Sequence, residues 1–380
     1  MLQAEVAVIG GGLAGAGFAS LLATAGREVL VVEREAGPHD KVCGEFLSRE
    51  AVLYLSALGI DLKALGGLPI ERLGLSAGKA SVVTRLPFQA MSLSRRVLDE
   101  AVLSRAAACG ARILRGRRVV AAQPSGDGMR LRLEDGVEVQ AATAVLATGK
   151  HDLRGHPRPP GRQNDLIGFK MMFRLAPRQA AALSRRVELM LFAGGYAGLQ
   201  PVEGDRANLC LLVRRDRFAA AGRSWQGLLA AIGEETPALA ERLEGASSAW
   251  ARPLSVAGLP YGLVVRAPDP DGSDLGRFWR LGDQAAVIPS FSGDGMSIAL
   301  HSAALAASAY LAGQGVGRFQ AQLASDVGAQ VSRATWLSRV FVHSRPQHGL
   351  LAAARLIPAA IRLGTVLTRV PENRLANVVG

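Results

Sequence analysis

Residues 6–19 read VAVIGGGLAGAGFA and carry glycines with GxGxxG spacing at Gly10, Gly12 and Gly15. The motif follows an expected strand over residues 3–9 and opens an expected helix over residues 13–25, with a second strand expected over residues 28–32. In such a βαβ unit the first glycine permits a tight turn, the second lets the backbone approach a pyrophosphate, and the third allows close packing of helix on strand. This stretch predicts a dinucleotide-binding fold at the start of the sequence.

A carboxylate stands where such a fold binds the adenosine ribose. Glu33 ends the second expected strand, at a spacing typical of the acidic residue that accepts hydrogen bonds from ribose hydroxyls. We assign to the same cofactor site Leu13 and Ala14, which begin the helix, and Arg34, which follows Glu33.

A second motif, RLGDQAAVIPSFSGDGMSIAL, covers residues 280–300. Asp283 follows an expected strand and a glycine, so its carboxylate is expected to reach a polyol such as the ribityl chain of a flavin. Gly293, Asp294 and Gly295 open an expected helix over residues 295–311, whose N-terminal amides favour an anion. Because a reduced flavin carries negative charge on its ring, the two motifs together predict a flavin dinucleotide.

Length and composition allow a large core. The sequence has 380 residues, of which 49% are hydrophobic and 20% charged, which suits two interwoven lobes. Cys43, Cys109 and Cys210 lie far apart without a CxxC pair, so we expect neither disulfides nor a metal site. With no secretory signal and no apolar run of about 18 residues, a cytoplasmic location is expected.

The charge balance is strongly basic, at +12. Nucleic-acid binding is not expected, because the arginines are scattered and aromatic residues make up only 5% of the sequence. Residues 327–380 are an exception, with seven arginines and a single acid, Glu372. Arg355, Arg362 and Arg369 recur every seven residues and would share a helical face, which leaves two alternatives: packing on the first lobe, or peripheral contact with a membrane.

The pattern of the sequence changes from Ile167 onwards. Strands expected over residues 167–175, 187–192, 196–202 and 208–213 alternate with glycine-rich turns and predict an antiparallel sheet. The expected fold is therefore α/β: a Rossmann-like FAD-binding lobe of the GR2 type, an inserted substrate lobe with an antiparallel sheet, and C-terminal helices. We place the FAD lobe at residues 1–75, 95–160 and 275–325, the substrate lobe at 76–94 and 161–274, and the helical segment at 326–380.

Several of these motifs together resemble a known superfamily. The GxGxxG start with Glu33, LSRRVLDEAVLSRAAACGARI at residues 93–113, ATG at residues 147–149 and the Gly282–Asp283 pair are similar to FAD-dependent oxidoreductases of the para-hydroxybenzoate hydroxylase type. Within that superfamily, KVCGEFLS at residues 41–48 resembles the geranylgeranyl reductase branch and its halogenase relatives. The resemblance implies FAD as cofactor.

The resemblance also assigns roles to single residues. Glu33 would bind the adenosine ribose, Arg95 or Arg96 the ribityl or phosphate region, Val120 the adenine edge, and Asp283 the ribityl chain. Further residues complete the expected cofactor site: Lys41, Cys43, Thr148, Gly149, Gly293, Gly295 and Met296, the last two against the flavin ring. Where the hydroxylases often carry a DG motif after the ATG strand, this sequence reads ATGKHDLRG, so the electron donor is left open between NAD(P)H and a separate reductase. Halogenation is not expected, because the four tryptophans, Trp225, Trp250, Trp279 and Trp336, are isolated.

Three functions are compatible with these residues. A monooxygenase acting on a hydrophobic or aromatic small molecule, such as a polyketide or quinone precursor, is favoured over a reductase of prenyl double bonds, and both over a flavin-binding protein without turnover. The reductase needs an acid near the flavin ring, for which Cys43 and Glu45 are the candidates. Apolar residues of the second lobe are expected to line the substrate pocket: Phe169, Met171, Phe173, Leu191, Tyr196 and Leu199.

Overall fold

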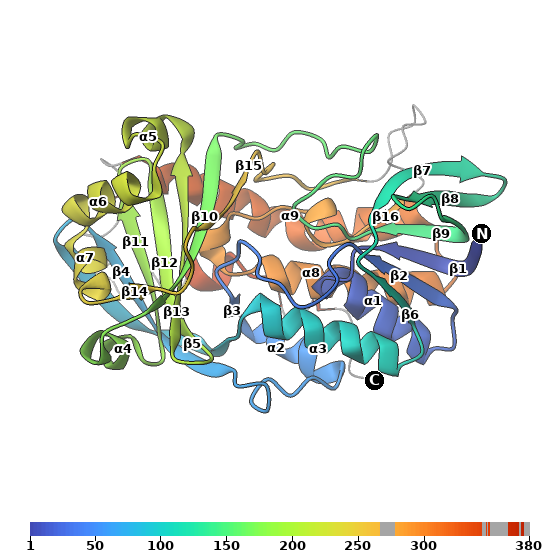
Figure 1. The fold of residues 1–380 in the computed structure, drawn as a ribbon, viewed down its shortest axis with the longest axis horizontal. Helices are drawn as coiled ribbons and strands as arrows, with labels where there is room; N and C mark the ends of the chain where they lie inside the picture. Colours follow the sequence, from blue (N-terminus) through green and yellow to red (C-terminus); the bar gives the residue numbers. More distant parts are fainter. Residues whose placement is uncertain (267–277, 344–346, 348, 350–363, 372–373, 376–380) are drawn as a thin grey trace.

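The computed structural model describes residues 1–266, 278–343, 347, 349, 364–371 and 374–375. Its strands form two sheets, one of seven strands and one of nine, which lie side by side along the longest axis of the molecule (Figure 1). The expected α/β fold is confirmed.

The seven-stranded sheet begins with the expected βαβ unit. Strand β1 pairs in parallel with β2 on one side and with β9 on the other, while β7, β8 and β9 form an antiparallel meander. The strands are β1 (Leu2–Ile9), β2 (Val29–Glu33), β6 (Arg112–Arg115), β7 (Val119–Ser125), β8 (Gly128–Leu133), β9 (Glu138–Leu146) and β16 (Phe278–Arg280). The Val, Leu and Ile runs of β1 and β2 are buried because both faces of these strands are covered.

Helices cover one face of this sheet. Helix α1 packs against both α3 and α8, and α8 in turn packs against α2 and α9. Their bounds are α1 (Leu13–Thr24), α2 (Arg49–Ala57), α3 (Arg95–Ala108), α8 (Gly295–Leu311) and α9 (Val316–Phe341). The helix predicted over residues 295–311 coincides with α8, and Ser94 caps α3 through a hydrogen bond from the Val97 amide.

The nine-stranded sheet is antiparallel except where β11 pairs in parallel with β4. Its strands are β3 (Phe46–Leu47), β4 (Leu68–Ala77), β5 (Ala80–Ser92), β10 (Leu166–Arg174), β11 (Arg186–Phe192), β12 (Gly195–Val202), β13 (Arg206–Arg214), β14 (Ser247–Ser248) and β15 (Leu254–Ala257). Short helices cover its outer face: α4 (Pro177–Leu183), α5 (Arg215–Ala220), α6 (Trp225–Glu235) and α7 (Pro237–Leu243).

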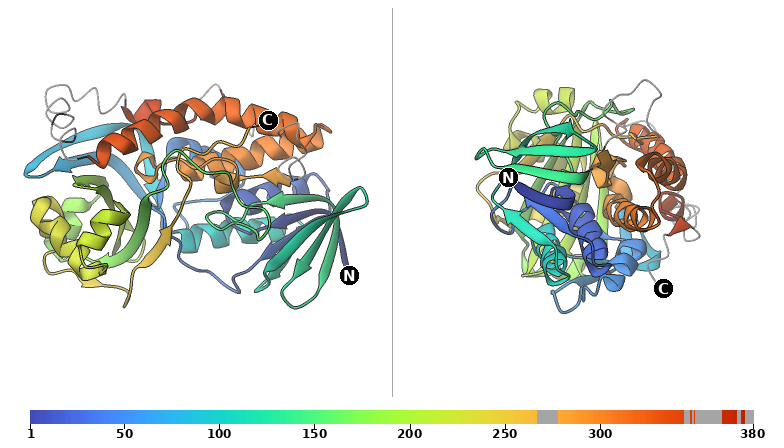
Figure 2. Two further views of the ribbon diagram at one scale, coloured as in Figure 1. Left: turned by 90° about the horizontal axis from the view of Figure 1, so that it is seen from above. Right: turned by 90° about the vertical axis from the view of Figure 1, so that its right-hand side faces the viewer.

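Two features differ from the expected organisation. Residues 68–77 belong to the nine-stranded sheet as β4, although the first lobe was expected to run to residue 75. Helix α9 begins at Val316 and crosses the expected boundary at residue 326; Figure 2 shows it running along both halves of the molecule. The two halves therefore share the C-terminal helix as a common support.

Candidate cofactor and substrate site

The glycine turn between β1 and α1 leaves no room for side chains at two of its three positions. Gly10 has φ +107°, and a Cβ on it would lie 2.4 Å from the Ala147 carbonyl oxygen. A Cβ on Gly15 would lie 2.0 Å from the Gly10 carbonyl oxygen, whereas one on Gly12 would meet only charged side-chain atoms at 3.4 Å or more. The backbone at Gly12 is thus open to a ligand at the N-terminus of α1, as a pyrophosphate requires.

Glu33 lies at the end of β2 with its carboxylate beside this turn. It accepts hydrogen bonds from the amides of Gly11 at 2.7 Å and Glu35 at 3.0 Å, and it is 8% exposed. A small cavity of about 20 Å³ next to it is also lined by Gly11, His39 and Arg96. Arg34 is exposed and pairs with Glu35.

Three charged side chains, which we call the Arg95 cluster, lie beside Gly12: Lys41, Arg95 and Asp99. Asp99 accepts hydrogen bonds from Arg95 Nε at 2.6 Å and Nη2 at 2.9 Å, and from Lys41 Nζ at 2.7 Å. Burial alone would raise the pKa of Asp99, but the two cations outweigh it and lower that pKa to about 2. Asp99 was missed from the sequence, although its spacing of four residues from Arg95 on a helix is a usable signal.

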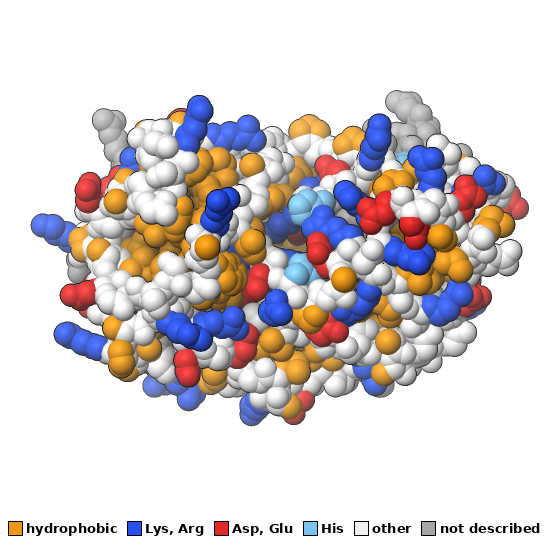
Figure 3. All heavy atoms as spheres, viewed as in Figure 1, with side chains coloured by type: hydrophobic (Ala, Val, Ile, Leu, Met, Phe, Trp, Pro, Cys, Tyr) orange, Lys and Arg blue, Asp and Glu red, His pale blue; other side chains and the backbone are white. Residues whose placement is uncertain are grey.

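A wider group of cations surrounds the same region. Burial lowers the pKa of His151, and the nearby charges of Arg34, Arg158, Lys150 and Lys41 lower it further. Figure 3 shows histidine and basic side chains gathered around the hollow between the two halves. This concentration of positive charge suits the diphosphate of a dinucleotide.

The other expected cofactor residues lie along the edges of this region. The β7–β8 register shifts between Val119 and Ala121, which places Val120 at an irregularity of the strand. Thr148 donates to the His151 carbonyl at 2.6 Å, and the Gly149 carbonyl accepts from Gln284. Among the described residues, the half-buried carboxylate of Asp283 has no hydrogen-bond partner, as expected of a group that meets a ribityl hydroxyl.

The turn before α8 is held by a buried aspartate. Gly293 has φ +68°, and a Cβ there would clash with the Phe46 ring at 2.6 Å. Next to it, Asp294 accepts hydrogen bonds from Gln330 Nε2 at 3.1 Å and the Val370 amide at 3.2 Å, and burial raises its pKa to about 7. A Cβ on Gly295 would meet only Ile288 Cγ2, at 3.9 Å, whereas Met296 is buried in the core of the first half.

The Cys43–Glu45 loop contains a second buried charge pair. Glu45 has φ +61° and is fully buried; its carboxylate accepts from Lys170 Nζ at 2.5 Å and from the Arg95 amide at 2.9 Å. Burial raises the pKa of Glu45 to about 7, despite Lys170. Lys170 on β10 was missed from the sequence, because a lysine in an apolar strand has no local signal for its partner.

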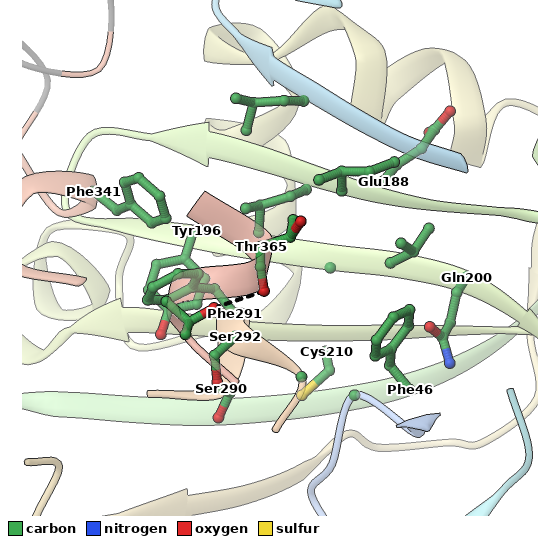
Figure 4. Close-up of a pocket in the computed structure, with 18 of the residues that line it drawn as sticks. Phe46, Glu188, Tyr196, Gln200, Cys210, Ser290, Phe291, Ser292, Phe341 and Thr365 are labelled. Atoms are coloured by element: carbon green, nitrogen blue, oxygen red, sulfur yellow. Dashed lines mark hydrogen bonds between the residues drawn. The ribbon is translucent and has the colours of Figure 1, made fainter. Parts of the chain in front are cut away.

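A cavity of about 270 Å³ opens between the nine-stranded sheet and the C-terminal part of the described chain. Phe46 and Gln200 lie at one end, and Tyr196, Phe291 and Phe341 at the other (Figure 4). The remaining wall is mainly aliphatic and includes Leu73, Leu75, Leu86, Val187, Leu189, Gly198, Cys210, Leu212 and Leu337. Part of the wall is formed by the C-terminal residues Thr365, Thr368 and Arg369. Gly44 and Gly293 connect this cavity to the two loops assigned to the cofactor.

The structure brings only part of the expected substrate pocket to this cavity. Tyr196 lines it, and Leu191 packs in the cluster behind it. Four residues expected in the pocket lie on the other face of the sheet, against helices α5, α6 and α7: Phe169, Met171, Phe173 and Leu199. The prediction was wrong for them because alternate residues of a strand point to opposite faces of the sheet. Cys43 and Glu45 are also outside the lining of the cavity, although Gly44 and Phe46 belong to it.

The basic tail is only partly described. Arg355, Arg362 and Glu372 lie outside the described residues, whereas Arg369 is 7% exposed and faces the molecule's interior. Its guanidinium lies 3.5 Å from Asp294 and 3.9 Å from Glu50. The seven-residue spacing would place Arg369 on a helical face shared with Arg355 and Arg362. Because Arg369 is buried, it does not belong to an exposed basic face.

Comparisons with known proteins agree with this geometry. A family model described as FAD binding domain matches residues 3–151. A menaquinone reductase from Mycolicibacterium smegmatis is 28% identical over 325 residues, which cover 80% of this chain and 76% of that protein. The ubiquinone hydroxylase UbiL from Rhodospirillum rubrum is 27% identical over 329 residues, covering 83% and 74%.

Solved structures share the whole fold. The flavin-dependent brominase Bmp2 superposes with a TM-score of 0.76 at 19% identity, covering 96% of this chain and 94% of that one. A geranylgeranyl bacteriochlorophyll reductase-like protein from Thermoplasma acidophilum has a TM-score of 0.76 at 16% identity, covering 100% and 96%.

The fold and the dinucleotide site define an FAD-dependent oxidoreductase. The glycine turn, the Glu33 carboxylate and the surrounding cations fit FAD, which would be held by these groups together with Asp283. Residues 3–151 match the FAD binding domain model, and the whole fold is similar to that of flavin-dependent enzymes of known structure. Among the residues that the structure describes, no helix is long and apolar enough to cross a membrane.

Proposed function

We propose that the protein is an FAD-dependent monooxygenase that hydroxylates the ring of a small molecule bearing a hydrophobic chain, such as a quinone or a phenolic quinone precursor. The observation that carries the proposal is the apolar cavity of about 270 Å³ that adjoins the cofactor loops at Gly44 and Gly293. FAD, when bound, supplies two-electron redox chemistry, with molecular oxygen as co-substrate in a hydroxylation. The similarity to a ubiquinone hydroxylase supports a quinone-type substrate.

The residues of the cavity suit a reaction that must exclude water. Burial raises the pKa of Cys210 to about 12 and that of Tyr196 well above its usual value, so both stay neutral. Glu188, an acid in the lining, is paired with Arg242 at 2.9 Å. An uncharged aromatic molecule with an apolar chain is therefore the kind of ligand that these walls favour.

A second function has its own support. A reduction is suggested by the similarity to menaquinone reductases, and the resemblance of residues 41–48 to the geranylgeranyl reductase branch suggests a prenyl double bond as its target. It needs a proton donor, and Glu45, with a pKa of about 7, would be protonated in part of the molecules at neutral pH. Against this, neither Glu45 nor Cys43 lines the described cavity.

Turnover with and without oxygen distinguishes the two reactions. We expect FAD-loaded enzyme, reduced chemically and mixed with prenylated naphthoquinone or phenol substrates, to add one oxygen atom to the ring only when oxygen is present. The other oxygen atom leaves as water, and the reduced flavin supplies the two electrons. A product that gains two hydrogens without oxygen, and that is lost in Cys43→Ala while FAD remains bound, would establish the reductase instead.

Filling the cavity tests whether it is the substrate site. Gly198 on β12 lines the cavity, and a Cβ there would meet only the Cys210 carbonyl oxygen, at 3.7 Å. We expect Gly198→Leu to lower turnover by about 100-fold or more, because the added side chain occupies substrate space, with little change in FAD content. Leu199→Met, the neighbouring position on the opposite face, is the control and should keep its activity. Full activity of Gly198→Leu would show that the substrate binds outside this cavity.

A further inference from the structure

Arg369 is a buried cation in the wall of an otherwise apolar cavity. Its side chain is 6% exposed, and it is the one lysine or arginine among the described residues that line this cavity. The carbon of its guanidinium lies 4.3 Å from the centre of the Phe88 ring and 5.5 Å from that of Phe46. A guanidinium stacked in this way keeps its N–H donors at its edges.

Those donors are mostly unused. Nη2 donates to the Ser292 carbonyl at 3.3 Å, while Nε and Nη1 have no hydrogen-bond partner among the described residues. The carboxylates of Asp294 and Glu50, at 3.5 and 3.9 Å from Nη1, balance its charge without accepting a hydrogen bond from it. Leaving buried charged donors unpaired is costly, so the site favours an additional oxygen acceptor.

The neighbouring charges specify the kind of acceptor. Two carboxylates, those of Asp294 at 3.5 Å and Glu50 at 3.9 Å, face the single guanidinium of Arg369, so acids outnumber the cation in this cluster. A carboxylate or phosphate on the ligand would be repelled by these two acids. A neutral carbonyl or phenol oxygen would accept a hydrogen bond without adding a third negative charge.

We propose that Arg369 binds a neutral ring oxygen of the substrate and so fixes the position of the ring in the cavity. The inference rests on the proposed function for the view that the ring is a quinone or phenol. Arg369 is thus a specificity residue: apolar walls would accept any hydrocarbon, and this donor selects one that carries oxygen on its ring.

The test compares two ligands that differ only in their ring oxygens, namely menadione and 2-methylnaphthalene. Affinities for the FAD-loaded protein are measured by quenching of flavin or tryptophan fluorescence. We expect the wild type to prefer menadione by about 10-fold or more, because a hydrogen bond from a charged donor is at stake. Arg369→Met should abolish this preference, and Arg369→Lys should keep part of it, since a lysine offers donors in a different geometry.

Arg333→Met is the matched control. Arg333 is exposed and holds the same segment from outside the cavity, by donating to the Leu367 carbonyl at 3.2 Å. It should keep the preference for menadione, and FAD content and melting temperature confirm that each variant is folded. The proposal is overturned if the wild type binds both ligands equally, if Arg369→Met retains the preference, or if Arg333→Met loses it to the same degree. Because the readout is binding, absence of quinone turnover would refute the proposed function without deciding this result.

Discussion

Two arginines of this protein, the half-buried Arg95 and the buried Arg369, are placed differently relative to their neighbouring acids. In the Arg95 cluster, Asp99 accepts two hydrogen bonds from Arg95, at 2.6 and 2.9 Å. In the Arg369 cluster, which comprises Glu50, Asp294 and Arg369, the shortest distance between an acid and the arginine is 3.5 Å. In the first cluster the single acid is hydrogen-bonded to both cations, beside the glycine turn expected to bind the cofactor, whereas in the second the arginine keeps unused donors in the wall of the apolar cavity. From this difference we expect Arg95 to contribute to cofactor binding and Arg369 to donate a hydrogen bond to a ligand in the cavity.

The largest expected difference concerns stability. Asp99→Asn removes the charge that pairs with both Arg95 and Lys41, and should lower the free energy of unfolding by about 2 kcal/mol, since it leaves two half-buried cations without their acid. Glu50→Gln, the equivalent change in the Arg369 cluster, should cost less than about 1 kcal/mol, because Glu50 lies 3.9 Å from the arginine. Urea unfolding at saturating FAD measures both. Equal losses of unfolding free energy in the two variants would show that the two clusters contribute equally to stability, contrary to this expectation.

The next largest expected difference is in FAD affinity, which should depend on Arg95 much more than on Arg369. Arg95→Met is expected to weaken FAD binding by about 10-fold to 100-fold, because a charge-assisted contact beside Gly12 is lost. Arg369→Met should change it less than about 3-fold. Titration of the apoprotein with FAD, followed by flavin fluorescence, gives both constants, and an equal loss in the two variants would assign Arg369 to the cofactor as well.

The smallest effect is a difference in pH dependence. The pKa of Asp294 is raised to about 7 in the folded protein, so its stabilising contribution is complete below about pH 4 and is lost as the pH rises towards 7. Asp99, with a pKa lowered to about 2, behaves in the opposite sense and loses its contribution only in acid. Between pH 5 and 7, the wild type should therefore lose about 1 kcal/mol or more of stability relative to Asp294→Asn. Parallel curves for the two proteins in urea unfolding would contradict this.

The sequence was most informative where function depends on backbone geometry. Gly10 and Gly15 are readable because no other residue fits there, and the capped helix α3 and the helix α8 follow from local patterns. The parallel pairing of β4 with β11 joins segments more than a hundred residues apart, and neither segment contains a signal for its partner.

The substrate pocket was predicted less well for a related reason. A nearly continuous apolar run, as in β10, identifies a strand with two buried faces but not which face meets the cavity, so Phe169, Met171, Phe173 and Leu199 were placed on the wrong side. Arg369 could not be assigned either, because its seven-residue spacing from Arg355 and Arg362 equally describes an exposed face. Contact of the tail with a membrane stays a prediction.

The position of residues 364–371 has a consequence for how the protein is made. These residues complete one wall of the cavity and leave the ribosome after both sheets have been synthesised. A growing chain can therefore assemble its nucleotide-binding half before a substrate chamber exists. A flavin bound before residues 364–371 are in place would lack the part of the wall that they contribute.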